Sequence, residues 1–170
     1  RKLTGALCDL HFAPTRTNKA NLINEGVKES SIFVTGNTVI DALKTTVKEE
    51  YSFRSSRLQS IDFLNKKVIT VTAHRRENLG EPLANICRAL LKLAEKYVDT
   101  EIVYPVHLNP AVQETVLKIL GGRERIHLID PLDVQDMHNL ISRSYIIMTD
   151  SGGLQEEAPS LGKPVLVLRN

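Results

Sequence analysis

The final part of the chain has the pattern of two buried strands joined by one helix. Residues 145–149 and 164–168 are short apolar runs, and residues 154–161 between them fit a helix that is ended by Gly162. Two fully apolar strands connected through a helix are typical of a βαβ unit, in which the strands run parallel and the crossover is right-handed. The pattern predicts a fold in which ligands bind beyond the carboxyl ends of the strands.

The turn between this strand and this helix has residues that suit a nucleotide. This turn consists of small residues, Ser151, Gly152 and Gly153, so a ligand can approach its backbone closely. The free N–H groups at a helix start attract an anion. Glu156 and Glu157, in the first turns of the helix, are suited to accept hydrogen bonds from sugar hydroxyls. The alternative is an ordinary strand-to-helix turn whose two glutamates complement the helix dipole.

The same alternation extends over residues 67–170. Strands are expected at 68–72, 101–104, 126–129, 145–149 and 164–168, and helices at 83–98, 109–120, 133–144 and 154–161. Five strands alternating with four helices specify a doubly wound parallel sheet of the Rossmann-like α/β class. Because the carboxyl ends of parallel strands share one edge, we expect His74, Arg75 and His107 to lie on the same rim as the glycine turn.

The front of the chain suggests a division into domains. Residues 1–48 also alternate between helix and strand patterns, and we interpret them as the end of a first Rossmann-like domain. Residues 49–66 are charged and contain several serines without a clear strand, so they are expected to be a linker. Residues 67–170 are then a second Rossmann-like domain, truncated because both ends of the chain have the character of a longer protein that has been cut.

Composition narrows the classes of function. The chain has 22 Lys and Arg against 20 Asp and Glu, a net charge of +2, and it lacks the basic block that nucleic-acid binding requires. Its apolar runs are too short for a membrane span. Cys8 and Cys87 have no metal-ligand spacing, so we expect no metal site and two reduced thiols of a cytoplasmic protein.

Three residues after the first strand of residues 67–170 are candidate diphosphate partners. Arg75 and Arg76 each offer a planar guanidinium that can form two hydrogen bonds to phosphate oxygens. His74 offers an imidazole donor that can be neutral or protonated. An isolated His-Arg-Arg-Glu sequence fits equally well with a solvated helix entry, in which an arginine pairs with Glu77.

Two residues of the expected helix 133–144 have weaker claims. Met137 can lie against a nucleobase, although a core position is favoured because Met fills irregular apolar gaps. His138, in the middle of the same helix, is expected to be structural or exposed and is assigned no role.

Four motifs together resemble those of the bacterial non-hydrolysing UDP-N-acetylglucosamine 2-epimerases. They are VTGNTVIDAL at 34–43, TAHRREN at 72–78, PVHLNP at 105–110 and TDSGGLQEEAPS at 149–160. The resemblance covers nearly the whole chain. It implies a glycosyltransferase-B-like architecture of two Rossmann-like domains, of which this chain is a partial copy, with a UDP-sugar bound in the cleft between them.

The resemblance also implies a reaction. The family interconverts UDP-GlcNAc and UDP-ManNAc without a cofactor, by eliminating UDP to give 2-acetamidoglucal and then adding UDP again with C2 inverted. The diphosphate must be held through both steps, which suits cations and helix-start amides. The product supplies ManNAc for cell-surface polysaccharide.

Roles can be carried over by motif. The resemblance implies that Ser151, Gly152 and Gly153 hold the diphosphate, that Glu157 accepts from the ribose hydroxyls, and that His74 is catalytic at the diphosphate and sugar end. Met137 matches a position near the uracil that is often aromatic in relatives.

Further partners follow from the same comparison. Arg75 and His107 match positions that contact a second UDP-GlcNAc, which activates several bacterial members, and the enzyme is expected to be a homodimer. The acidic catalytic residues of the family lie mostly upstream of Arg1, so these 170 residues are expected to bind UDP weakly and not to epimerise by themselves.

Two other functions fit parts of the pattern. A glycosyltransferase of the same architecture also uses a helix start for diphosphate and a glutamate for ribose, although the HRREN and HLNP segments favour the epimerase. A UDP-sugar-binding fragment without turnover is the second alternative.

Overall fold

The structure is a computed structural model that describes residues 2–169. It divides into two compact units, Arg1–Ala42 and Leu43–Asn170, and the division falls within helix α3 (Thr38–Thr46). None of the helices in residues 2–169 has both the length and the apolar character needed to cross a bilayer.

The first unit is small and built on two parallel strands. Strands β1 and β2 pair in parallel. In the chain, helix α1 precedes β1, and helix α2 and a short 3-10 turn connect β1 to β2. The rings of Phe12 and Phe33 lie 6.1 Å apart on the two strands and remain 67% and 47% exposed. A two-stranded sheet is too small to bury such residues. The elements are α1 (Lys2–Ala6), β1 (His11–Ala13), α2 (Arg16–Asn24) and β2 (Ile32–Val34).

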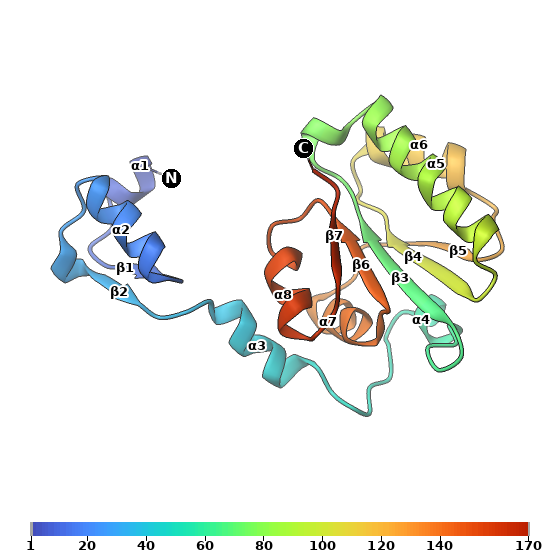
Figure 1. The fold of residues 1–170 in the computed structure, drawn as a ribbon, viewed down its shortest axis with the longest axis horizontal. Coiled ribbons are helices and arrows are strands. Elements are labelled where there is room, and N and C mark those ends of the chain that lie inside the picture. Colours follow the sequence, from blue (N-terminus) through green and yellow to red (C-terminus); the bar gives the residue numbers. More distant parts are fainter. Residues whose placement is uncertain (1, 170) are drawn as a thin grey trace. The chain divides into compact units, whose positions relative to one another are not determined.

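The second unit is organised around a five-stranded parallel sheet (Figure 1). The strands lie in the order β5-β4-β3-β6-β7, and every neighbouring pair is parallel. This is the order of the Rossmann fold, with the chain reversing direction across the sheet between β3 and β6. The strands are β3 (Lys67–Thr72), β4 (Thr100–Pro105), β5 (Ile126–Ile129), β6 (Ile146–Thr149) and β7 (Val165–Val167).

Helices cover both faces of this sheet. Figure 1 shows α5 and α6 on one side and α7 and α8 on the other. Along β3, Ile69 and Val71 pack against α5 and α6, whereas Val68 packs with Leu140 of α7, as the alternation of a strand requires. The helices are α5 (Glu81–Lys96), α6 (Pro110–Leu120), α7 (Val134–Arg143) and α8 (Leu154–Ser160).

The expectation of five parallel strands alternating with four helices is confirmed. Element boundaries differ by one or two residues. The helix expected at 83–98 is α5, which begins at Glu81 and ends at Lys96, because Tyr97 is extended and its N–H closes the helix on the Leu93 carbonyl. Asp133 caps α7, with its side chain accepting from the Asp136 N–H at 2.9 Å.

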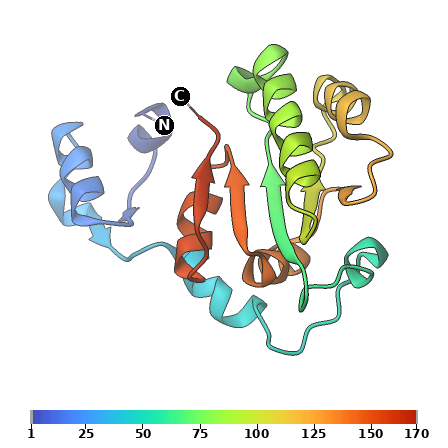
Figure 2. The same ribbon diagram turned by 45° about the vertical axis from the view of Figure 1, so that its right-hand side comes forward.

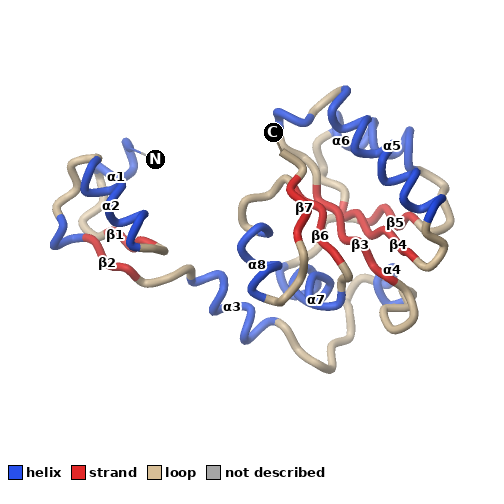
Figure 3. The backbone as a smooth tube through the Cα atoms, viewed as in Figure 1, coloured by secondary structure: helices blue, strands red, loops and turns tan. Residues whose placement is uncertain are grey.

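Residues 49–66 are drawn mostly as loop with the short helix α4 (Ser56–Gln59) (Figure 3). They are nevertheless attached to the second unit. Phe53, Leu58 and Ile61 are buried in one cluster with Val68 of β3 and Leu140 of α7. This stretch therefore contributes to the core of that unit, on the face of the sheet that α7 covers.

One buried carboxylate fixes the path of this stretch. Asp136 on α7 is 2% exposed and accepts from the Tyr51 hydroxyl at 2.7 Å and from the Arg54 and Ser55 N–H groups at 3.1 and 3.0 Å. Burial, followed by this hydrogen bond and by the charges of Asp136 and Asp133, raises the pKa of Tyr51 from 10.0 to about 12.

This contact gives a pH-dependent prediction. Because the folded-state pKa of Tyr51 lies above its ordinary value, its contribution to stability is complete below pH 10 and is lost as the pH rises through about 12. Tyr51→Phe should lower the free energy of unfolding by about 1 kcal/mol below pH 10. The difference from the parent protein should then shrink towards pH 12, as measured by denaturant titration. A difference that grows with pH would contradict it.

Candidate functional site

The polar turns lie together where the order of the sheet reverses. The strands β3 and β6 are neighbours, and Figure 2 shows the arrowheads of β3, β6 and β7 at the same edge of the sheet. Thr72 and Thr149 end the paired strands, and their buried hydroxyls lie 2.6 Å apart. In an open parallel sheet this reversal leaves a crevice beyond the carboxyl ends of the strands, where ligands bind.

Asp150 joins the two turns at this edge. Its fully buried side chain extends from the end of β6, and Oδ2 accepts from the N–H groups of His74 and Arg75, both at 2.8 Å. The same oxygen accepts from the Asn78 amide at 2.9 Å, and that amide also donates to the Leu168 carbonyl after β7. One carboxylate therefore sets the course of the backbone that carries His74 and Arg75.

The second oxygen of Asp150 faces the His74 ring. Oδ1 is buried without a hydrogen-bond partner in residues 2–169 and lies 3.8 Å from His74 Nδ1. A buried carboxylate oxygen without a partner is costly. This arrangement favours a His74 ring with its Nδ1 proton directed at Asp150, which leaves Nε2 for a ligand.

His74 and His107 stack on each other. Their ring centroids lie 4.9 Å apart with an interplanar angle of 10°, although the residues follow different strands, β3 and β4. His107 Nδ1 accepts from the Asn109 N–H at 3.0 Å, which assigns its proton to Nε2. The buried Tyr104 hydroxyl donates at 2.6 Å to the carbonyl of Ala73, the residue before His74.

Arg75 and Glu157 lie over the glycine turn. A methyl group at Gly152 would lie 3.8 Å from Arg75 Nη2, and one at Gly153 would lie 3.2 Å from Glu157 Oε1. Arg75 also pairs with Glu77 at 3.4 Å. A cation, a carboxylate and an exposed backbone thus surround one small region, which suits a ligand with both phosphate and hydroxyl groups.

Helix α8 starts without a side-chain cap. In α2, α6 and α7 a side chain accepts from the first turn, contributed by Thr15, Asn109 and Asp133, whereas α5, which follows Gly80, has no side-chain cap. The residue before α8 is Gly153, and no described side chain caps this helix. The Glu156 N–H donates to the Gly153 carbonyl and the Ser151 N–H to the Thr149 hydroxyl, both at 2.9 Å, so only part of this helix start is open to an anion.

The predicted residues are found at three places around this region. His74 and Arg75 follow β3, His107 follows β4, and the Ser-Gly-Gly turn follows β6. Met137 lies on α7, where its partly buried side chain packs against the cluster of Ile141 and the α8 residues. This contact is what a core methionine makes.

Sequence reasoning assigned no role to Asp150 or His138. Asp150 stood within the quoted TDSGG motif, directly after a strand and on the predicted rim, so its position alone was a usable signal. His138 had no such signal, because a histidine in the middle of a helix is identified as buried and bridging only by what packs against it.

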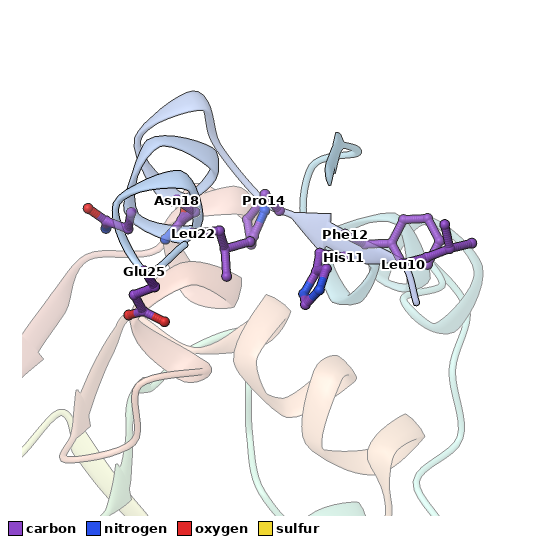
Figure 4. A pocket seen from close by; sticks show the side chains of 9 residues that line it. Leu10, His11, Phe12, Pro14, Asn18, Leu22 and Glu25 are labelled. Carbon is purple, nitrogen blue, oxygen red and sulfur yellow. The ribbon is translucent and has the colours of Figure 1, made fainter. Parts of the chain in front are cut away.

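A pocket elsewhere in the chain is separate from these residues. It has a volume of about 330 Å³ and lies in the first unit between β1 and α2 (Figure 4). Leu10 and Phe12 line it from the β1 side, and Leu22 lies on the α2 side together with Asn18 and Glu25. It contains none of the predicted site residues. In residues 2–169 no group of three His, Cys, Asp or Glu side chains is arranged to hold a metal ion.

Asp150 offers a direct test of how the site is held. Asp150→Ala would remove the acceptor of two backbone N–H groups and one amide, so we expect the free energy of unfolding to fall by about 3 kcal/mol. Asp130→Ala is the matched control, because Asp130 follows β5 and is exposed. Equal denaturation midpoints for the two variants would show that Asp150 does not support the turn.

Comparison with known proteins connects this geometry to one family. Residues 1–170 match the family described as UDP-N-acetylglucosamine 2-epimerase. The UDP-N-acetylglucosamine 2-epimerase of Bacillus subtilis is 55% identical over 170 residues, which are 100% of this chain and 44% of that protein.

Solved structures agree with the fold. The S. aureus MnaA–UDP co-structure is 53% identical with a TM-score of 0.90, covering 100% of this chain and 46% of that one. The UDP-GlcNAc 2-epimerase from Neisseria meningitidis bound to UDP-GlcNAc is 46% identical with a TM-score of 0.90, covering 100% of this chain and 47% of that one. The chain spans less than half the length of these relatives. It belongs to the UDP-N-acetylglucosamine 2-epimerase family.

Proposed function

We propose that this chain forms the UDP-binding part of an isomerase that interconverts UDP-GlcNAc and UDP-ManNAc. The observation that carries the proposal is the convergence of Arg75, His74 and Glu157 on an uncapped glycine turn at the reversal point of the sheet. The Neisseria meningitidis relative is described as bound to UDP-GlcNAc, and the S. aureus relative as bound to UDP. Together they favour a nucleotide sugar as the ligand of this turn.

The proposed binding of UDP follows from the contacts. The diphosphate lies on the turn of Ser151, Gly152 and Gly153, where the helix start has no side-chain cap. The Ser151 N–H donates to the Thr149 hydroxyl at 2.9 Å, which leaves the N–H groups of Gly152 and Gly153 for the phosphates. Glu157, in the first turn of α8, accepts from the ribose hydroxyls. Met137, which packs beside α8, lies near the uracil.

The chemistry needs a stabilised leaving group. In the elimination, the C2–H and C1–O bonds of the sugar break, a base takes the proton, and UDP leaves with the electron pair of the C1–O bond. His74 acts here as an imidazolium: its Nδ1 proton faces Asp150, and its Nε2 proton is donated to the departing diphosphate. Re-addition reverses these steps with the proton returned to the opposite face of C2.

Further parts of the proposal concern partners. Arg75 and His107 contact a second UDP-GlcNAc that activates the enzyme. The His107 ring stacks on the ring of His74, so a residue proposed for the activator touches a residue proposed for the substrate. The enzyme acts as a homodimer in the cytoplasm and supplies ManNAc for cell-surface polysaccharide. These parts stay predictions.

The domain boundaries also stay a proposal. We propose that 1–48 complete a first Rossmann-like domain, that 49–66 connect it to the second, and that 67–170 form the UDP-binding domain. The uncovered Phe12 and Phe33 on a two-stranded parallel sheet support the first part, because such a sheet is typically an edge of a larger one. The contacts divide the chain at Ala42 and Leu43, and residues 49–66 pack on the second unit.

Turnover by the full-length protein tests the reaction. With UDP-GlcNAc, no acceptor and D2O as solvent, we expect UDP-ManNAc that carries deuterium at C2, detected by NMR. Release of free ManNAc would indicate hydrolysis instead. An unchanged substrate would support a glycosyltransferase, the runner-up function. These 170 residues alone should bind UDP without turnover, and turnover by them would contradict the proposed division of labour.

Gly152→Ala separates a functional glycine from a structural one. Gly152 does not have a positive φ, and an added methyl would meet only Arg75 Nη2 at 3.8 Å, so thermal stability should change little. The methyl would instead occupy the approach of the diphosphate, and we expect UDP affinity to fall about tenfold. Calorimetry with UDP measures this affinity. An unchanged affinity would show that the diphosphate does not bind at this turn.

A further inference from the structure

His138 is a buried histidine that the proposed reaction does not use. It lies on α7, is 4% exposed, and has a polar partner at each ring nitrogen. Nδ1 is 2.8 Å from the Thr46 hydroxyl at the end of α3, and Nε2 is 3.5 Å from Glu157 Oε2 on α8. Three residues from three helices therefore form one connected set.

The contacts are consistent with one arrangement of protons. The Glu157 carboxylate is an acceptor, so the ring directs a proton at it from Nε2. In the neutral ring Nδ1 is then the acceptor, and the Thr46 hydroxyl donates to it. The 3.5 Å separation is longer than a strong hydrogen bond and lies within ion-pair distance.

Glu157 is held between this histidine and the glycine turn. Its side chain is 14% exposed, with Oε2 near His138 and Oε1 3.2 Å from where a Cβ of Gly153 would lie. One oxygen is thus occupied by protein and the other is presented at the turn. A carboxylate fixed in this way accepts from a diol without first losing conformational freedom.

The end of α3 is itself fastened to α7. The Asn139 amide donates to the Thr46 carbonyl at 2.8 Å, and its oxygen accepts from the Lys48 N–H at 3.1 Å. Thr46 is therefore placed by backbone contacts that do not involve His138. This makes the Thr46 hydroxyl a fixed reference for the orientation of the ring.

We propose that His138 is a positioning residue that holds Glu157 ready for the ribose hydroxyls, with Thr46 orienting the ring. The proposal rests on the proposed function, since it assumes that Glu157 binds ribose. A histidine that only fills space would not need partners at both nitrogens, nor a functional carboxylate as one of them. The set explains why a polar residue occupies a buried face of α7 next to apolar Leu140 and Ile141.

The experiment compares UDP with its 2′-deoxy and 3′-deoxy analogues by calorimetry on the full-length protein. The parent protein should prefer UDP over at least one analogue, and Glu157→Gln should remove that preference. His138→Phe should weaken UDP binding about tenfold and leave binding of that analogue almost unchanged, because only the ribose contact is lost. His138→Gln, which keeps an N–H near Nε2, should retain most of the preference.

Two further variants separate a loss of the ribose contact from general damage to the fold. Thr46→Val removes only the hydroxyl and should reduce the same preference by a smaller factor. His127→Phe is the matched control, because His127 Nε2 pairs with Glu101 at 2.6 Å between β5 and β4, in an equivalent histidine–glutamate contact. It should leave the preference for UDP unchanged. In the double variant with Glu157→Gln, His138→Phe should cause no additional loss.

The outcomes separate the two proposals. If Glu157→Gln weakens UDP binding and His138→Phe does not, the positioning role is wrong while the proposed ribose contact stands. A loss at His138→Phe that is equal for UDP and both analogues also overturns the positioning role, because it reports general damage. If Glu157→Gln leaves UDP affinity unchanged, the ribose contact is wrong and the inference fails with it.

Discussion

The site depends on one buried carboxylate that crosses the reversal point of the sheet. Asp150 ends β6, yet three of its hydrogen bonds go to the turn after β3. Without this carboxylate, the two N–H groups of that turn would have no hydrogen-bond acceptor, which is costly. Hydrogen bonds to an ionised carboxylate are also among the strongest in proteins. Arg75 and His74, the cation and the histidine that we assign to the nucleotide-sugar ligands, therefore take their backbone positions from the buried Asp150.

Helix α7 has a second organising role. Asp136 and Asn139 bind the backbone between Thr46 and Ser55, while Met137 and Ile141 pack towards α8. Because 3.6 residues make a turn, adjacent positions of one helix serve different neighbours. The same helix therefore fixes the stretch that follows α3 and supports the helix that carries Glu157, with His138 touching both.

The polar groups of this unit fall into two kinds. The Asp136 carboxylate has hydrogen-bond partners for both oxygens and fixes the fold. By contrast, Asp150 Oδ1 lacks a partner among the described residues, and the start of α8 is uncapped. The His74 ring faces the first of these groups, and an anionic ligand can complete the second. Their position beside the glycine turn is the physical reason to assign this edge to a nucleotide.

The sequence by itself determined the alternation of elements, the parallel sheet and the gathering of His74, Arg75 and the glycine turn on one edge, because strand and helix periodicity is local. It did not determine that β3 lies between β4 and β6, which depends on packing between distant segments. Only the tertiary structure decided that Asp150 holds the turn after β3, 75 or 76 residues earlier, and that His138 lies between Thr46 and Glu157. A single residue's partner across such distances in sequence has no periodic signal, since it is selected by how the layers pack.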